Sequence, residues 1–132
     1  MAKEQYILEL GMLEQEAGRL EQQMQIIDQQ IFELQNLQFG LQELDKSKEK
    51  EILTNIGKNI FIKTEILSKE LIVEVGNKNL VKKSIPETIK IIEEQLGRLI
   101  EAKQKVIEKI QELQMQMEKL IVQAEKEDKD KK

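Results

Sequence analysis

Apolar residues in the first 45 positions are spaced alternately by three and four residues. The apolar stripe consists of Tyr6, Leu10, Leu13, Ala17, Leu20, Met24, Ile27, Ile31, Leu34 and Leu41, and Gln38 is its polar interruption. This alternation keeps the side chains on one narrow face of an α-helix, as in a coiled coil. Because a single helix cannot cover such a face, residues 4–45 are predicted to form a long helix that pairs with another.

The same spacing returns near the C-terminus, over residues 85–125. Its members are Ile85, Ile89, Ile92, Leu96, Leu99, Val106, Ile110, Leu113, Met117, Leu120 and Ala124, interrupted by Lys103. As helices the two segments have similar lengths, each roughly 60 Å. Matched lengths predict that they pair with each other as the arms of one antiparallel hairpin.

Two polar residues, Gln38 and Lys103, interrupt the stripes. A polar residue on a coiled-coil face costs stability and can fix the register of the helices. The alternative is a tolerated defect, with the Lys103 stem reaching outward to solvent. The sequence leaves both explanations open.

The start of the second helix is marked by Ser84, Pro86 and Glu87. Ser84 with Glu87 three residues later forms a capping-box pattern, which satisfies unpaired backbone donors of the first turn. Pro86 is tolerated there because the first turn needs no donor from it.

Between the arms the apolar period changes to two, and β-branched residues become frequent. Four short strands are predicted, at residues 52–56, 59–66, 71–75 and 79–83. Glycine followed by Asn and Lys, at 57–59 and 76–78, predicts two tight turns with positive φ. The predicted fold class is α+β, mainly α: an antiparallel coiled-coil helical hairpin with two β-hairpins between the helices.

These strands carry more apolar surface than they can bury. Four short strands form too small a sheet, and open strand edges favour pairing with another chain. The insert at 51–83 is therefore predicted to assemble oligomers. The expected interface residues are Ile60, Phe61, Ile62, Ile66, Leu71, Val73 and Val75.

The composition excludes several classes of function. The 132 residues fit one domain, which would end in a charged, frayed tail at 126–132. There is no Cys or His, and no phosphate-binding or nucleophile motif, so we expect no enzyme, metal or cofactor. The net charge of −4, with mixed signs, argues against nucleic acid. With no long apolar run, we expect no membrane contact and a cytoplasmic location.

Apolar residues that lie off the stripes form two groups. Near the insert, Phe32, Leu37, Phe39, Leu44, Ile91 and Ile100 are expected to pack against the sheet or a neighbouring subunit. At the free tip of the hairpin, Ile7, Leu8, Met12, Met115, Ile121 and Val122 are expected to bind partner proteins. The alternatives for the tip are ordinary scattered surface residues, or tips that meet in a larger bundle.

The order of these elements, with the stretches ILTNIGKNIFIK and IVEVGNKNLVKKS, resembles prefoldin of the alpha class. Many relatives have Pro at the position of Asn55. The resemblance implies a hexamer with prefoldin beta subunits, two alpha and four beta, whose arm tips hold non-native client proteins without ATP and pass them to a group II chaperonin. A coiled-coil scaffold or a filament-forming protein that bridges specific partners is the alternative.

Overall fold

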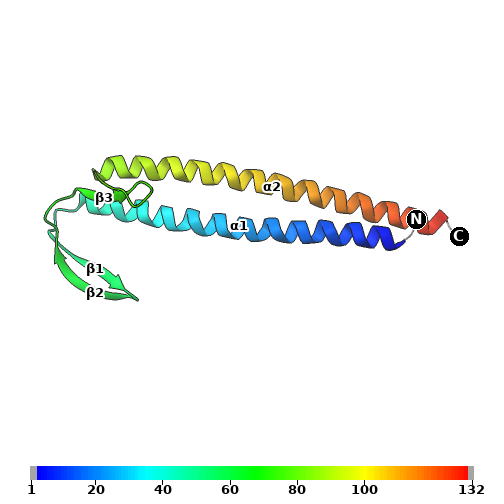
Figure 1. Ribbon diagram of the computed structural model, residues 1–132, viewed down its shortest axis with the longest axis horizontal. Helices are drawn as coiled ribbons and strands as arrows, with labels where there is room; N and C mark the ends of the chain where they lie inside the picture. The colour runs from blue at the N-terminus through cyan, green and yellow to red at the C-terminus, as the bar shows by residue number, and fades with distance from the viewer. Residues whose placement is uncertain (1–2, 131–132) are drawn as a thin grey trace. The chain divides into compact units, whose positions relative to one another are not determined.

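The computed structural model describes residues 3–130 and is mainly helical (Figure 1). Its elements in chain order are α1 (Lys3–Lys46), β1 (Glu51–Gly57), β2 (Ile60–Glu65), β3 (Leu71–Glu74), β4 (Leu80–Lys83) and α2 (Ile85–Asp130). The predicted fold class, two long helices with two antiparallel β-hairpins between them, is confirmed.

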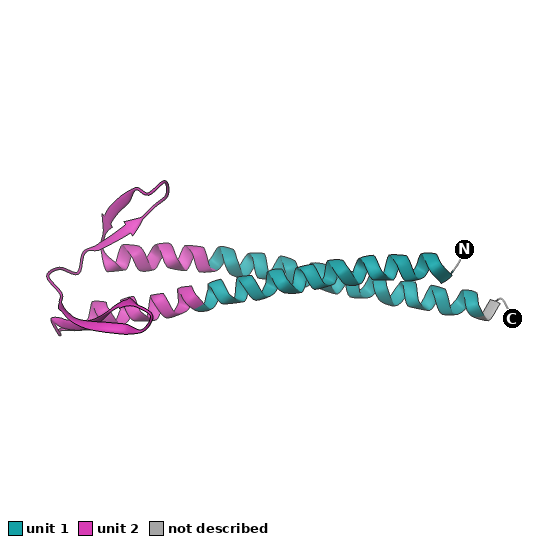
Figure 2. Ribbon diagram, turned by 60° about the horizontal axis from the view of Figure 1, so that its bottom comes forward, with its two compact units in different colours: residues 1–32, 97–132 teal, residues 33–96 magenta. Residues whose placement is uncertain are grey.

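The chain forms two compact units, residues 1–32 with 97–132, and residues 33–96 (Figure 2). In the first unit, segments of α1 and α2 lie side by side around buried Leu20, Ile27 and Val106. The side chains packed against these three are Met24, Ile31, Leu99, Ala102, Ile110 and Leu113. All of these residues except Ala102 belong to the apolar stripes, so the stripes are the surfaces through which the helices pair.

Cross-helix contacts show that the arms run antiparallel in the first unit. Lys3 near the start of α1 lies 3.5 Å from Asp128 near the end of α2, and Asp28 lies 2.8 Å from Lys103. α2 is helical through Asp130, five residues beyond the predicted end of the second arm at 125. The frayed tail expected at 126–132 stays a prediction. Residues 131–132 lie outside the described part of the chain.

In the second unit, the start of α2 is fixed by Ser84. The Ser84 Oγ accepts a hydrogen bond from the Glu87 backbone N–H at 3.2 Å, as predicted for an N-cap. The Glu87 carboxylate accepts from the Ser84 hydroxyl at 3.0 Å, where a capping box would use the Ser84 backbone N–H. Ile85, which follows the cap, is 1% exposed, so the start of α2 is held by packing as well as by hydrogen bonds.

The four strands form two separate two-stranded antiparallel sheets, β1 with β2 and β3 with β4. Both connecting turns have the predicted positive φ, at Gly57, Lys58 and Asn59 and again over residues 76–78. Consecutive left-handed residues match the right-handed twist of a hairpin. Ile66 and Val75 were predicted to end strands, but β2 and β3 each end one residue earlier. The backbone N–H groups of Ile66 and Val75 still donate hydrogen bonds, to the backbone oxygens of Lys50 and Asn79 respectively.

Candidate functional site

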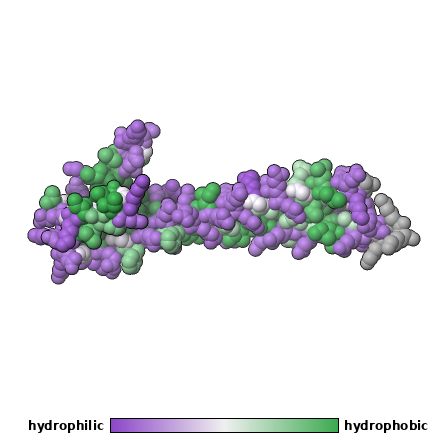
Figure 3. Space-filling view, turned by 90° about the horizontal axis from the view of Figure 1, so that it is seen from below, coloured by the Kyte–Doolittle hydropathy of each residue, from purple (hydrophilic) through white to green (hydrophobic). Residues whose placement is uncertain are grey.

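The predicted binding residues near the free ends of the helices are exposed. Their side chains are Ile7, Leu8, Met12, Met115, Ile121 and Val122, and their exposed fractions run from 45% for Ile121 to 66% for Ile7. In Figure 3, hydrophobic surface gathers close to the helix ends of the first unit. This surface is concentrated on a few turns of helix, and it is the kind of patch that a partner covers.

A hollow of about 200 Å³ lies between the ends of the two helices in the first unit. Its lining combines apolar and aromatic side chains with three charged ones: Lys3, Tyr6, Ile7, Leu10, Leu120, Ile121, Ala124, Glu125 and Asp128. We call this hollow the tip pocket. It is smaller than the roughly 300 to 1,000 Å³ of small-molecule sites, so its size suits a single large apolar side chain.

The six predicted residues do not form one site. Ile7 and Ile121 line the tip pocket, whereas Met115 and Val122 line a separate shallow hollow of about 400 Å³ on α2. Leu8 and Met12 are exposed on α1 and line neither hollow. The sequence therefore identified an apolar region, and the structure divides it into three parts.

Four lining residues of the tip pocket were assigned from sequence only to helix pairing: Tyr6, Leu10, Leu120 and Ala124. Each is half-buried, because it belongs to the last layers of the stripe. Their position in the sequence could have indicated this role, because the terminal layers of a coiled coil have no further layer to cover them. They can contribute to helix pairing and to binding at once.

Burial and two nearby carboxylates affect the Tyr6 hydroxyl. Burial raises the pKa of the Tyr6 hydroxyl, and a hydrogen bond to Glu127 together with the negative charges of Glu127 and Glu9 raises that pKa further. The phenol therefore stays neutral at physiological pH and can donate a hydrogen bond at the edge of the tip pocket.

The β insert is the second exposed apolar surface. Ile60, Phe61, Ile62 and Val75 are exposed, and Ile66, Leu71 and Val73 are half-buried. In the first hairpin the register pairs Asn55 with Phe61 and Thr54 with Ile62, so Phe61 lies on the opposite face from Ile62. Apolar side chains thus project from both faces of this hairpin.

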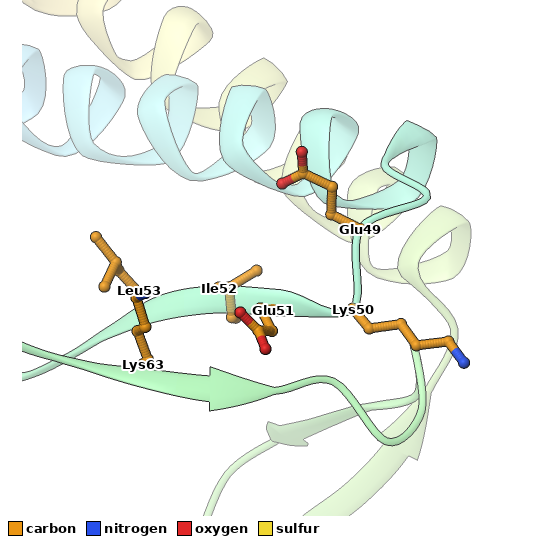
Figure 4. A pocket seen from close by; sticks show the side chains of 6 residues that line it. All are labelled: Glu49, Lys50, Glu51, Ile52, Leu53 and Lys63. Carbon is orange, nitrogen blue, oxygen red and sulfur yellow. The ribbon is translucent and has the colours of Figure 1, made fainter.

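A wide hollow beside β1 is lined by Glu49, Lys50, Glu51, Ile52, Leu53 and Lys63 (Figure 4). Four of these six side chains are charged. Lys63 lies opposite Leu53 on the paired strand. This hollow beside β1 has the character of a solvated strand surface.

Among residues 3–130, no group of three or more His, Cys, Asp or Glu side chains could hold a metal ion.

One feature of the insert could not be seen in the sequence. The Lys69 ammonium donates hydrogen bonds to the backbone oxygens of Asp45 and Ser47, at 2.9 and 2.8 Å. These carbonyls lie at the C-terminal end of α1, where oxygens lack partners within the helix and the helix dipole favours a cation. Lys69 therefore fastens the linker between the two hairpins to the end of α1.

The off-stripe residues near the insert divide in a similar way. Phe32, Leu37, Phe39 and Ile100 are exposed, whereas Leu44 and Ile91 are half-buried. Leu37 and Phe39 belong to the same unit as the hairpins and stay exposed there. Contact of the four exposed residues with a neighbouring subunit stays a prediction. None of the helices in the described part of the chain is long and apolar enough to cross a membrane.

The exposed apolar side chains near the helix ends and the unpaired strand edges of the insert are surfaces suited to contact with other chains. Residues 13–130 match the model of the prefoldin family, described as prefoldin subunit. The chain therefore belongs to the prefoldin family, a non-enzymatic chaperone family.

A solved structure shows the same fold. It is the cryo-EM structure of filamentous PFD from Methanocaldococcus jannaschii, with a TM-score of 0.51 over 90% of this chain and 94% of that chain. The two sequences are 22% identical, so this likeness concerns the fold alone. No curated protein matches the sequence.

Proposed function

We propose that this chain is an alpha-class prefoldin subunit that acts as an ATP-independent holdase in the cytoplasm. Its tip residues Ile7, Leu8, Met12, Met115, Ile121 and Val122 bind unfolded proteins, which are then passed to a group II chaperonin. The observation that carries the proposal is the exposed apolar tip with its pocket for one large side chain. Unfolded proteins expose such side chains, and folded proteins mostly bury them.

Weak contacts at one tip become useful when several tips act together. Linking several weak sites raises the effective concentration of each, without any new contact. We propose that the strands supply this link by joining the chain to prefoldin beta subunits in a hexamer of two alpha and four beta. Support comes from the exposed Ile60, Phe61 and Ile62, and from the two hairpins, the number that distinguishes the alpha class from the beta class.

The first test measures mass and holdase activity. We expect multi-angle light scattering to give a hexamer mass when the chain is mixed with a prefoldin beta subunit. We expect this complex to keep a chemically denatured client soluble in the absence of ATP. A mixture that does not co-assemble and gives no protection would overturn the proposal.

Two matched substitutions on α1 test the binding residues. Met12→Ser removes an exposed apolar side chain near the tip, and Ile26→Ser removes one elsewhere on the same arm. The exposures of the two side chains are similar, 64% for Met12 and 60% for Ile26. We expect client protection to fall for Met12→Ser alone, with the hexamer mass unchanged. Equal loss in both variants would remove the tip assignment.

The second candidate is a filament or scaffold formed by this chain alone. It is favoured by the likeness to a PFD described as filamentous, and by the unpaired strand edges of the insert. Sedimentation without beta subunits distinguishes the two: a polydisperse, concentration-dependent series of masses supports the filament, and a small defined species supports the hexamer subunit.

A further inference from the structure

Each polar residue on the apolar stripes has a partner on the other helix. In the first unit, Lys103 Nζ lies 2.8 Å from Asp28 Oδ1. In the second unit, Gln38 Nε2 donates a hydrogen bond to Glu93 Oε1 at 3.3 Å. Asp28 and Glu93 lie directly beside a stripe position on their helices, so a stripe residue pairs with a flanking residue both times.

These pairs share one register. The two residue numbers add up to 131 for Lys103 with Asp28, for Gln38 with Glu93, and for Lys3 with Asp128. The first and third pairs belong to the first unit and the second pair to the second unit, so the same register holds within each unit.

The inner layers of the apolar stripes fit more than one register. They repeat every seven residues, so sliding one helix by seven residues brings apolar layers back into contact. Such a slide places Glu21 or Gln35 opposite Lys103, depending on its direction, and places Pro86 or Ile100 opposite Gln38. Glu21 could still pair with Lys103, but Gln38 loses its partner in both directions. The observed register satisfies both polar residues.

We propose that the Lys103–Asp28 pair, supported by Gln38–Glu93, selects the register of the arms and so assembles the tip pocket. A slide of seven residues moves one helix by about 10 Å along the other. That movement would separate Tyr6 and Leu10 from Leu120 and Ala124, which line the pocket together. Lys103 and Asp28 are positioning residues in this scheme, and the register does not depend on what the tip binds.

The pair adds to a preference that the apolar stripes begin. The Lys103 and Asp28 side chains are 38% and 50% exposed, so solvent screens their attraction. The pair does not have to hold the helices together, because the apolar stripes do that. A slide of seven residues keeps the inner apolar layers and loses the end layers, and the polar pairs add to that difference in free energy.

The register can be measured with two spin labels, because the chain has no cysteine. Gln15→Cys and Glu101→Cys place nitroxides at exposed positions of the first unit, staggered along the helices. Labelled chains are diluted with unlabelled chains, so that pulsed dipolar spectroscopy reports distances within one chain. We expect a single distance in the parent. Lys103→Leu with Gln38→Leu should add a second distance in at least about a tenth of the molecules, without lowering the melting temperature.

A second pair of variants moves the register in opposite directions. Asp28→Gln leaves Glu21 as the acid available to Lys103, and the resulting slide shortens the label distance. Asp28→Gln with Gln35→Asp instead places an acid seven residues further along α1, at position 35. The slide that pairs this acid with Lys103 lengthens the distance between the labels. Glu14→Gln is the control. It removes an acid from the same side of α1, but Glu14 does not come to lie opposite Lys103 in either slid register, so the label distance should not change. Folded variants that all keep the parent distance would overturn the proposal.

Discussion

The tip and the β insert both expose apolar side chains, but their backbones differ. At the tip the exposed residues belong to continuous helices, whose backbone hydrogen bonds are made within each helix. In the insert, exposed residues belong to two-stranded sheets, where every strand has an unpaired edge. The exposed helical surface of the tip therefore offers mainly side chains, whereas the insert offers side chains together with rows of backbone donors and acceptors.

This difference suits the two surfaces to different partners. Side-chain contacts with flexible residues such as Met12 and Met115 tolerate many sequences and geometries. Strand pairing fixes direction and register, because a shift of one residue turns every side chain to the other face. The physical chemistry thus favours variable, short-lived contacts at the tip and defined, lasting ones at the insert.

The largest expected effect comes from breaking the insert. Ile62→Glu with Val73→Glu places a charge on each hairpin in the predicted interface, and burying an unpaired carboxylate in an assembly is costly. We expect loss of the assembled species by light scattering, with helix content by circular dichroism unchanged. Lys58→Glu with Lys78→Glu is the control, because it makes a larger change in charge at the exposed turns of the same hairpins. An intact oligomer in the first variant would show that the insert is not the assembly element.

A smaller effect is expected from Lys69→Met, which removes the ammonium that binds the end of α1. The loss should be about 0.5 to 1 kcal/mol, typical of an exposed cation at a helix C-terminus. Hydrogen exchange should rise at the amides of residues 66–70, while exchange at the tip stays the same. Lys63→Met should have no such effect, and equal exchange in both variants would mean that Lys69 does not hold the linker.

The smallest expected effect is on the titration of Tyr6, the single tyrosine of the chain. Its raised pKa means that the folded state favours the neutral phenol. The resulting stabilisation is present below the ordinary value of 10.0 and is lost as the pH rises through the higher pKa of the folded state. Near-ultraviolet absorbance of the phenolate follows this titration directly. Glu127→Gln should lower the pKa toward 10.0, and an unchanged titration would remove Glu127 as a contributor.

Features set by local spacing were predictable from the sequence. The apolar stripes, the Ser84 cap and the two turns depend on residues close together in the chain, and each is present in the structure. Features that need distant residues to meet were not predicted. The Lys69 contact with Asp45 and Ser47 gives no periodic signal, and the separation of Ile7 and Ile121 from Met115 and Val122 depends on how the helix ends face each other.

The partners of Gln38 and Lys103 show the same limit. Their positions on the stripes were evident, but the choice between a defect and a register device required knowing what lies across the helix pair. The structure supplies Glu93 and Asp28, which are acceptors at matching heights. Both residues therefore have a partner on the other helix, and their role in setting the register stays a proposal.

The two separate sheets have a consequence for the geometry of assembly. With two sheets of two strands each, a chain presents four free edges, and so behaves as a building block with several points of attachment. If the rotation from one chain to the next closes on itself, all edges are paired within a ring of fixed size. If it does not, chains keep adding through the same edges and form a helical filament. A small change in the angle between neighbours can thus decide between a finite particle and a polymer, even when every individual strand contact is the same.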